Sequence, residues 1–198
     1  MNEVMGNKQQ TIVTGTHPKL FNMWLFIVSI CMMFAGFTSA YVVSKSAGKW
    51  LEFDLPSMLW YSSAVIVVSS ITMQLSYYFA AKDKFNLLKL FVASTFVLGI
   101  VFLVTQFEAW KQIYNYDYKI VFAGKQSNVS GSLFYVITGL HALHIISAVI
   151  FLFVVLIYTL QNKIHSKKML NIKMCTTYWH FLGGLWIYLF LFLLLNNS

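Results

Sequence analysis

Five long apolar stretches separate the polar segments of this chain, and they limit the folds that are open to it. They run from about Leu20 to Val43, Pro56 to Ala81, Leu90 to Phe107, Gly131 to Leu160 and Met174 to Leu195. A helix needs about 20 apolar residues to cross a hydrocarbon core of about 30 Å. A helix also satisfies its own backbone hydrogen bonds, which lipid cannot do. We therefore predict an all-α integral membrane bundle of five transmembrane helices over residues 20–198, preceded by a polar N-terminal segment, residues 1–19.

The composition excludes a soluble globular domain. Hydrophobic residues make up 59% of the chain and charged residues only 10%, which leaves too little polar side chain to cover a water-soluble surface. The third stretch is the shortest of the five, because Lys89 and Glu108 close it. Its two ends are therefore expected near the membrane interface.

The lysines predict an orientation. The N-terminal segment and the loops after the second and fourth stretches hold nine lysines and two acids, whereas the other side holds five lysines and four acids. By the positive-inside rule, the N-terminus lies in the cytoplasm and the C-terminus outside. All 14 basic residues are lysines spread over short loops, which is not the pattern of a nucleic-acid-binding patch. No nucleic-acid partner is expected.

The two cysteines are not expected to form a disulfide or a metal site. Cys31 and Cys175 have no partners at metal-ligand spacing. In the predicted topology they lie roughly 15 Å apart in depth, at 1.5 Å of helix rise per residue.

A few polar or amphipathic side chains lie within the apolar stretches or at their ends. Polar groups in a membrane are costly, so each one needs an explanation. The candidates for structural or lipid contacts are His141, His144, His180, Trp179, Gln106 and Glu108.

Two of the histidines are predicted to lie at nearly the same depth. From the helix rise, His144 lies roughly 20 Å below the outer face and His180 roughly 9 Å above the inner face. Adjacent antiparallel helices could bring these imidazoles together. Two imidazoles from different helices can ligate a b-type haem. The alternative is that each histidine bonds a buried carbonyl, a hydroxyl or a lipid group and ties helices together. His141 lies one turn further out than His144, on nearly the same face.

Glu108 is the carboxylate closest to a predicted span. As a structural residue it would be an interfacial anchor paired with Lys111, three residues on. As a functional residue it would be a proton relay or a lipid head-group contact. Because it lies at the outer end of its helix, it belongs to a different site from the inner-half histidines.

Four of the five stretches resemble a known family. The segments WLFIVSICMMFAGFTSAY (24–41), LGIVFLVTQFEAW (98–110), GSLFYVITGLHALHII (131–146) and YWHFLGGLWIYLFLF (178–192) have the order and spacing of subunit III of the haem-copper terminal oxidases. The chain resembles the short, five-helix bacterial form, which lacks the first two helices of the seven-helix version. The TGxHxxH and YWHF elements carry most of the resemblance.

The resemblance implies a non-redox subunit of a respiratory, proton-pumping cytochrome c oxidase. In that family the haems and copper reside in partner subunits. Subunit III packs against subunit I, binds phospholipid between its helices, and sustains proton uptake and the working life of the enzyme. By position, His141, His144 and His180 match the family's intramembrane histidines, and Gln106 and Glu108 match its Q-x-E element. The resemblance therefore implies that this chain has no catalytic, metal-binding or cofactor-binding residue. The implied location is the bacterial inner membrane, with subunits I and II and phospholipids as partners.

Two positions depart from the family pattern. The family usually has a buried Glu where this chain has Ile30, and often an Asp where it has Gly183. These replacements weaken any role for this chain as the donor of a buried carboxylate to a proton route. The alternatives left open are a quinol oxidase subunit of the same family, a b-haem membrane anchor and, disfavoured by the scarcity of midplane charge, a small transporter. Membership of a larger respiratory supercomplex is also left open.

Overall fold

The structure is a computed structural model that describes residues 18–46, 57–122, 129–161 and 169–196. Five helices and no strand occupy these residues, which confirms the all-α prediction. The helices are α1 (Pro18–Ser46), α2 (Met58–Ala81), α3 (Phe85–Phe122), α4 (Val129–Leu160) and α5 (Leu170–Asn196). Each is long and apolar enough to cross a membrane. Nearly all of the predicted N-terminal segment, and many of the lysines used for the orientation, lie outside the described residues.

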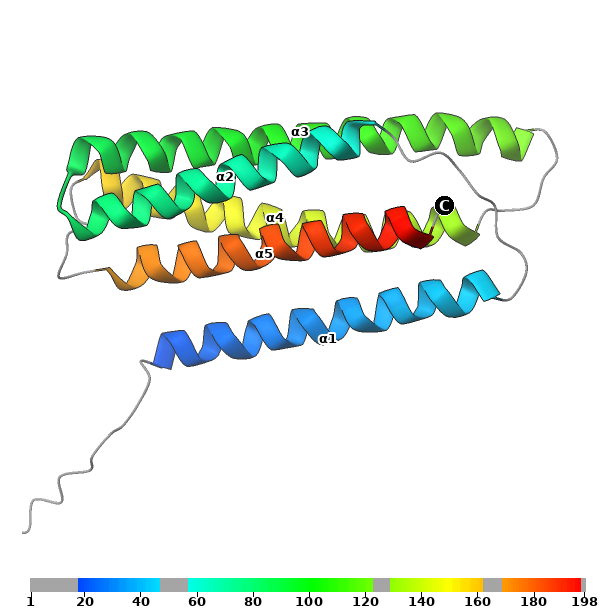
Figure 1. The fold of residues 1–198 in the computed structure, drawn as a ribbon, viewed down its shortest axis with the longest axis horizontal. Coiled ribbons are helices and arrows are strands. Elements are labelled where there is room, and N and C mark those ends of the chain that lie inside the picture. The colour runs from blue at the N-terminus through cyan, green and yellow to red at the C-terminus, as the bar shows by residue number, and fades with distance from the viewer. Residues whose placement is uncertain (1–17, 47–56, 123–128, 162–168, 197–198) are drawn as a thin grey trace, which may run out of the picture.

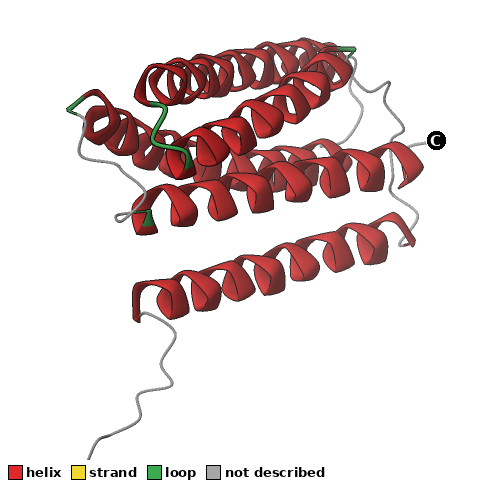
Figure 2. Ribbon diagram, turned by 60° about the vertical axis from the view of Figure 1, so that its left-hand side comes forward, coloured by secondary structure: helices red, strands yellow, loops and turns green. Residues whose placement is uncertain are grey.

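The helices alternate in direction, and α1 lies at the edge of the bundle. Within the described residues α2 packs on α3 and α5, α3 also packs on α4, and α4 packs on α5, so these four helices close a ring. Among the described residues, helix α1 packs only on α4 and α5. Figure 1 and Figure 2 show it flanking α5 on the side away from α2 and α3. The Lys45 ammonium bonds the Asn196 carbonyl and so ties the last turn of α1 to the end of α5.

Helix α3 is longer than its apolar stretch. The prediction ended the third stretch at Phe107 and made it the shortest, but α3 has 38 residues and is the longest of the five helices. The reason is that charged side chains end an apolar stretch without ending the backbone hydrogen bonds of a helix. Glu108 and Lys111 even form an i,i+3 ion pair on the exposed face of α3, with 2.8 Å between Oε1 and Nζ.

Hydrogen bonds between side chains join the helices of the ring. In each pair a hydroxyl or an indole N–H on one helix meets a hydroxyl on its neighbour. The pairs are Trp179–Ser69 (3.0 Å) and Trp186–Ser63 (3.1 Å) between α5 and α2, Thr72–Thr95 (2.9 Å) between α2 and α3, Trp110–Thr138 (3.1 Å) between α3 and α4, and Ser147–Tyr178 (2.9 Å) between α4 and α5. These bonds satisfy polar groups that lipid would leave unpaired.

Gly99 of α3 allows the indole of Trp179 to pack closely against the α3 backbone. A Cβ at Gly99 would lie 2.7 Å from Cη2 of Trp179 and 3.3 Å from Cγ2 of Val149. The indole of Trp179 cannot move away freely, because its Nε1 donates to Ser69. A methyl group at position 99 would therefore displace the indole or lengthen this bond.

We predict that Gly99→Ala destabilises the bundle by about 1 to 3 kcal/mol, the usual cost of overpacking a core. The measurement is unfolding of the purified chain in mixed micelles by titration with dodecyl sulfate, followed by circular dichroism. Gly36→Ala is the matched control, because a Cβ at Gly36 meets nothing within 4 Å. Equal midpoints for the two variants would contradict the proposed packing.

Candidate functional site

The six candidate side chains are distributed over the bundle and do not form one cluster. His141, Gln106 and Trp179 are buried inside the ring, whereas His144 and His180 are half-buried and Glu108 is exposed. The buried three cannot contact lipid in this fold. Their contacts are with other side chains of the protein.

His141 lies among aromatic rings at the centre of the bundle. Its side chain is 0% exposed, and its ring contacts Phe34, Phe102 and Trp186 at centroid distances of 5.2 to 6.3 Å. Neither of its ring nitrogens has a hydrogen-bond partner within the described residues. In the described part of the chain, His141 therefore packs against aromatic rings and bonds no group.

Gln106 is the second buried polar group without a partner. It is 2% exposed, and neither its Oε1 nor its Nε2 is hydrogen-bonded within the described part of the chain. The Trp110–Thr138 bond fixes the register of α3 against α4. Gln106 and His141 lie one helical turn away from this bond, toward the start of α3 and toward the end of α4. Buried polar atoms are rarely unpaired in native proteins, so the unpaired atoms of these two side chains are costly to the bundle.

His144 faces α1. Its Nδ1 donates to the Leu140 carbonyl, 2.7 Å away, because a carbonyl oxygen can only accept. Its ring contacts Phe26 and Phe34 of α1 at centroid distances of 6.2 and 6.0 Å. This imidazole therefore helps to pack α1 against α4.

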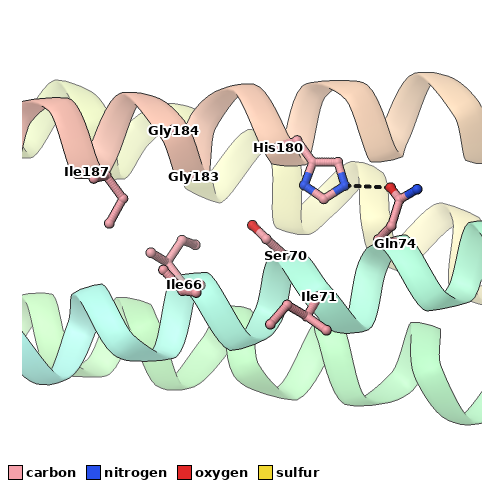
Figure 3. Close-up of a pocket in the computed structure, with 9 residues that line it drawn as sticks. Ile66, Ser70, Ile71, Gln74, His180, Gly183, Gly184 and Ile187 are labelled. Atoms are coloured by element: carbon pink, nitrogen blue, oxygen red, sulfur yellow. Dashed lines mark hydrogen bonds between the residues drawn. The ribbon is translucent and has the colours of Figure 1, made fainter.

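His180 faces α2 instead. Its Nε2 donates to Gln74 Oε1, 3.0 Å away, and thereby joins α5 to α2 (Figure 3). His144 and His180 thus have different helices as partners, and within the described residues no hydrogen bond or ring contact joins them. The prediction that these imidazoles lie at nearly the same depth did not determine whether they meet, because depth does not fix the direction in which a side chain leaves its helix. The geometry does not favour a haem held between them.

Glu108 forms the expected pair with Lys111. The two side chains are 47% and 53% exposed, so the pair lies on the surface of α3. Exposed ion pairs of this kind contribute little to stability. Nothing in the pair's contacts connects Glu108 with the histidines.

A pocket between α1, α4 and α5 was missed by the sequence analysis. It has a volume of about 410 Å³ and is lined by Lys19, Asn22, Met23, Phe26, Phe151, Met174 and Tyr178. Lys19 and Asn22 begin α1 and supply the polar end, while the other side chains form an apolar wall. The lysine was used only as an orientation signal, although Lys19, Asn22, Met23 and Phe26 share one face of α1 by their spacing.

A second hollow lies between α2 and α5. This groove has a volume of about 290 Å³ and is lined by Ile66, Val67, Ser70, Ile71, Gln74, His180, Gly183, Gly184 and Ile187 (Figure 3). We call it the α2/α5 groove. A Cβ at Gly183 would lie 3.1 Å from the Ser70 hydroxyl, whereas a Cβ at Gly184 meets nothing within 4 Å. Gly183 therefore lets the two helices approach each other, and Gly184 leaves the outer side of the groove open.

The two positions that depart from the family pattern have different environments. Ile30 is 2% exposed and belongs to the apolar core. Gly183 is buried against Ser70 at the base of the groove. In this chain neither position carries a group that could accept or donate a proton.

Comparisons with known proteins agree with the resemblance. The family model for cytochrome c oxidase subunit III matches residues 2–197. The chain is 28% identical to cytochrome c oxidase subunit 3 of Corynebacterium diphtheriae, over 96% of this chain and 97% of that protein. It is 25% identical to cytochrome bo(3) ubiquinol oxidase subunit 3 of Buchnera aphidicola subsp. Schizaphis graminum, over 93% and 97%. With the probable cytochrome c oxidase subunit 3 of Nocardia farcinica the identity is 31%, over 84% and 82%. The chain therefore belongs to the cytochrome c oxidase subunit III family.

Proposed function

We propose that this chain is the non-redox subunit III of a respiratory haem-copper oxidase that oxidises cytochrome c, reduces dioxygen to water and pumps protons. The observation that carries the proposal is the family match over residues 2–197, nearly the whole chain. The haems and copper belong to partner subunits. Subunit I, which holds the catalytic centre, and subunit II are the proposed partners within the membrane.

A quinol is the alternative electron donor. Relatives of both kinds match this chain over more than 90% of its length, one named a cytochrome c oxidase subunit and one a ubiquinol oxidase subunit. The donor is chosen by subunit II, so the genes beside this one distinguish the two cases. A neighbouring subunit II with copper-ligating cysteines would assign cytochrome c, and one without them would assign a quinol.

The proposed location is the bacterial plasma membrane, with the N-terminus in the cytoplasm. The five helices of the described residues support this proposal, because an odd number of crossings leaves the two ends of a bundle on opposite sides of the membrane. The excess of lysine on the N-terminal side supports the orientation.

The candidate residues are proposed to hold the subunit together, and none is proposed as a metal ligand. His144 packs α1 against α4, and His180 bonds Gln74 across the α2–α5 interface. Trp179 bonds Ser69, while His141 and Gln106 fill the centre of the ring. Glu108 is proposed as an interfacial anchor with Lys111.

The pocket between α1, α4 and α5 is the proposed phospholipid site. Lys19 and Asn22 offer an ammonium and an amide at the end of α1, where a phosphate head group lies at the interface. Phe26, Phe151 and Met174 supply an apolar wall for an acyl chain. A lipid held there would fill the space between α1 and the ring.

We predict that detergent extraction recovers this chain together with a subunit that has a haem-copper spectrum. Deletion of the chain should leave the initial turnover of the oxidase nearly unchanged but shorten its active life, because no redox centre is lost. The measurement is oxygen uptake over repeated turnovers. Recovery of the chain only as a free homo-oligomer, or immediate loss of haem from subunit I on deletion, would count against the proposal.

We predict that Lys19→Gln weakens the binding of phosphatidylglycerol about fivefold, because a lysine near an anionic surface contributes about 1 kcal/mol. Native mass spectrometry of the purified complex measures the lipid retained. Lys82→Gln is the matched control, since Lys82 is exposed at the end of α2, bonds Tyr78 and lies outside the pocket. The same loss in both variants would show a general charge effect and no site.

We predict that the chain expressed alone shows no b-type absorption spectrum, since His144 and His180 have partners on different helices. The experiment is a reduced-minus-oxidised spectrum of the purified chain after growth with a haem precursor. A b-type spectrum that disappears in His180→Ala would instead support the membrane-anchor hypothesis.

A further inference from the structure

The α2/α5 groove exposes polar groups at hydrocarbon depth. Gln74 lies seven residues before the end of α2, and His180 lies ten residues after the start of α5. These distances correspond to about 10 and 15 Å from the helix ends on the same side of the bundle. Both side chains therefore lie within a hydrocarbon core of about 30 Å.

The hydrogen bond between Gln74 and His180 uses only part of the hydrogen-bonding capacity of the two side chains. His180 Nε2 donates to Gln74 Oε1, and within the described residues neither the amide group of Gln74 nor Nδ1 of His180 has a partner. Gln74 is exposed and His180 is half-buried, so these atoms face the surroundings of the bundle. Hydrocarbon tails offer no hydrogen bond, and lipid head groups lie too far away to reach this depth.

The shape of the groove favours a helix as its occupant. Gly184 is exposed and a Cβ there would meet nothing, so the backbone of α5 is bare beside Gln74 and His180. In membranes, small residues allow helix backbones to approach closely, and amide and imidazole side chains bond across such contacts. The other lining residues are isoleucines, a valine, a serine and Gly183, so the small imidazole of His180 is the one aromatic ring among the described residues that line the groove.

We propose that the α2/α5 groove is the docking surface for a transmembrane helix of another oxidase subunit, which carries a hydrogen-bond acceptor opposite the Gln74 amide. This inference rests on the proposed function, which supplies a partner within the membrane. Gly184 sets the distance of approach, and Gln74 and His180 fix the depth at which the partner helix binds.

The test uses the whole oxidase, expressed with all of its subunits. Gln74→Leu removes the amide but keeps a side chain of similar size, and Gly184→Leu fills the open side of the groove. Each variant should lower the recovery of this chain with the haem-bearing subunit about fivefold. Gly36→Leu is the matched control, since Gly36 is an exposed glycine on α1 whose added Cβ meets nothing. It should leave recovery unchanged.

A photo-crosslinker locates the contact without relying on these variants. Benzoylphenylalanine at Val67, which lines the groove, should crosslink to another subunit of the complex. The same group at Val97, an exposed valine of α3 outside the groove, should crosslink to lipid. The amount of each variant in the membrane, and its helicity after purification alone, separate loss of docking from loss of folding.

Three outcomes would overturn the proposal. One is normal recovery of both groove variants together with loss of Gly36→Leu, which would place the interface on α1. The second is a crosslink from position 67 to lipid alone. The third is labelling of α2 or α5 in the complex by a photoreactive quinone, with no crosslink to a polypeptide, which would assign the groove to a small planar ligand. If the unmodified chain fails to copurify with a haem-bearing subunit, the proposed function fails as well.

Discussion

The interface between α2 and α5 fixes the positions of the α5 tryptophans and of the polar side chains in the α2/α5 groove. Two indole N–H groups of α5, from Trp179 and Trp186, donate to Ser69 and Ser63 of α2. The tryptophans are seven residues apart and the serines six, or about 10.5 and 9 Å along their helices, so antiparallel helices can make both bonds at once. Because lipid cannot satisfy these donors, a shift in register that broke the two bonds would be costly unless other acceptors replaced the serines. Gly183 then lies between the two tryptophans and allows the close approach.

The number and type of the helices could be predicted from the sequence, because apolar length alone decides whether a segment crosses a bilayer. The length of α3 could not, since its apolar stretch ends at Glu108 while its backbone continues as a helix. The histidines show the same limit in another form. His141 and His144 are three residues apart and, as expected for nearly one face, both contact Phe34 of α1, yet His141 is fully buried whereas His144 is half-buried. Only the packing of the neighbouring helices decides this difference.

Helix α1 is held differently from the other four. Within the part of the chain that the structure describes, it packs on α4 and α5 alone. The contacts are aromatic ones around Phe34 and His144, a long bond from Tyr188 to Thr38 and the bond from Lys45 to the end of α5. Ile30, where the family usually has a glutamate, adds only apolar contact to this interface. The proposed lipid in the pocket beside Lys19 would add contacts at the N-terminal end of α1. In this interpretation lipid is part of the packing of the subunit.

The exposed polar groups of the groove connect the stability of the subunit with its assembly. Inside the ring, His141 and Gln106 carry the cost of their unpaired atoms whether or not a partner is present. Gln74 and His180 differ from them, because a neighbouring helix can reach their free atoms. Their unpaired atoms destabilise the free chain, and a partner that supplies an acceptor removes this destabilisation. The free energy of docking therefore includes this gain in addition to the new packing. A subunit built in this way is more stable in the proposed complex than alone. This difference favours the assembled oxidase.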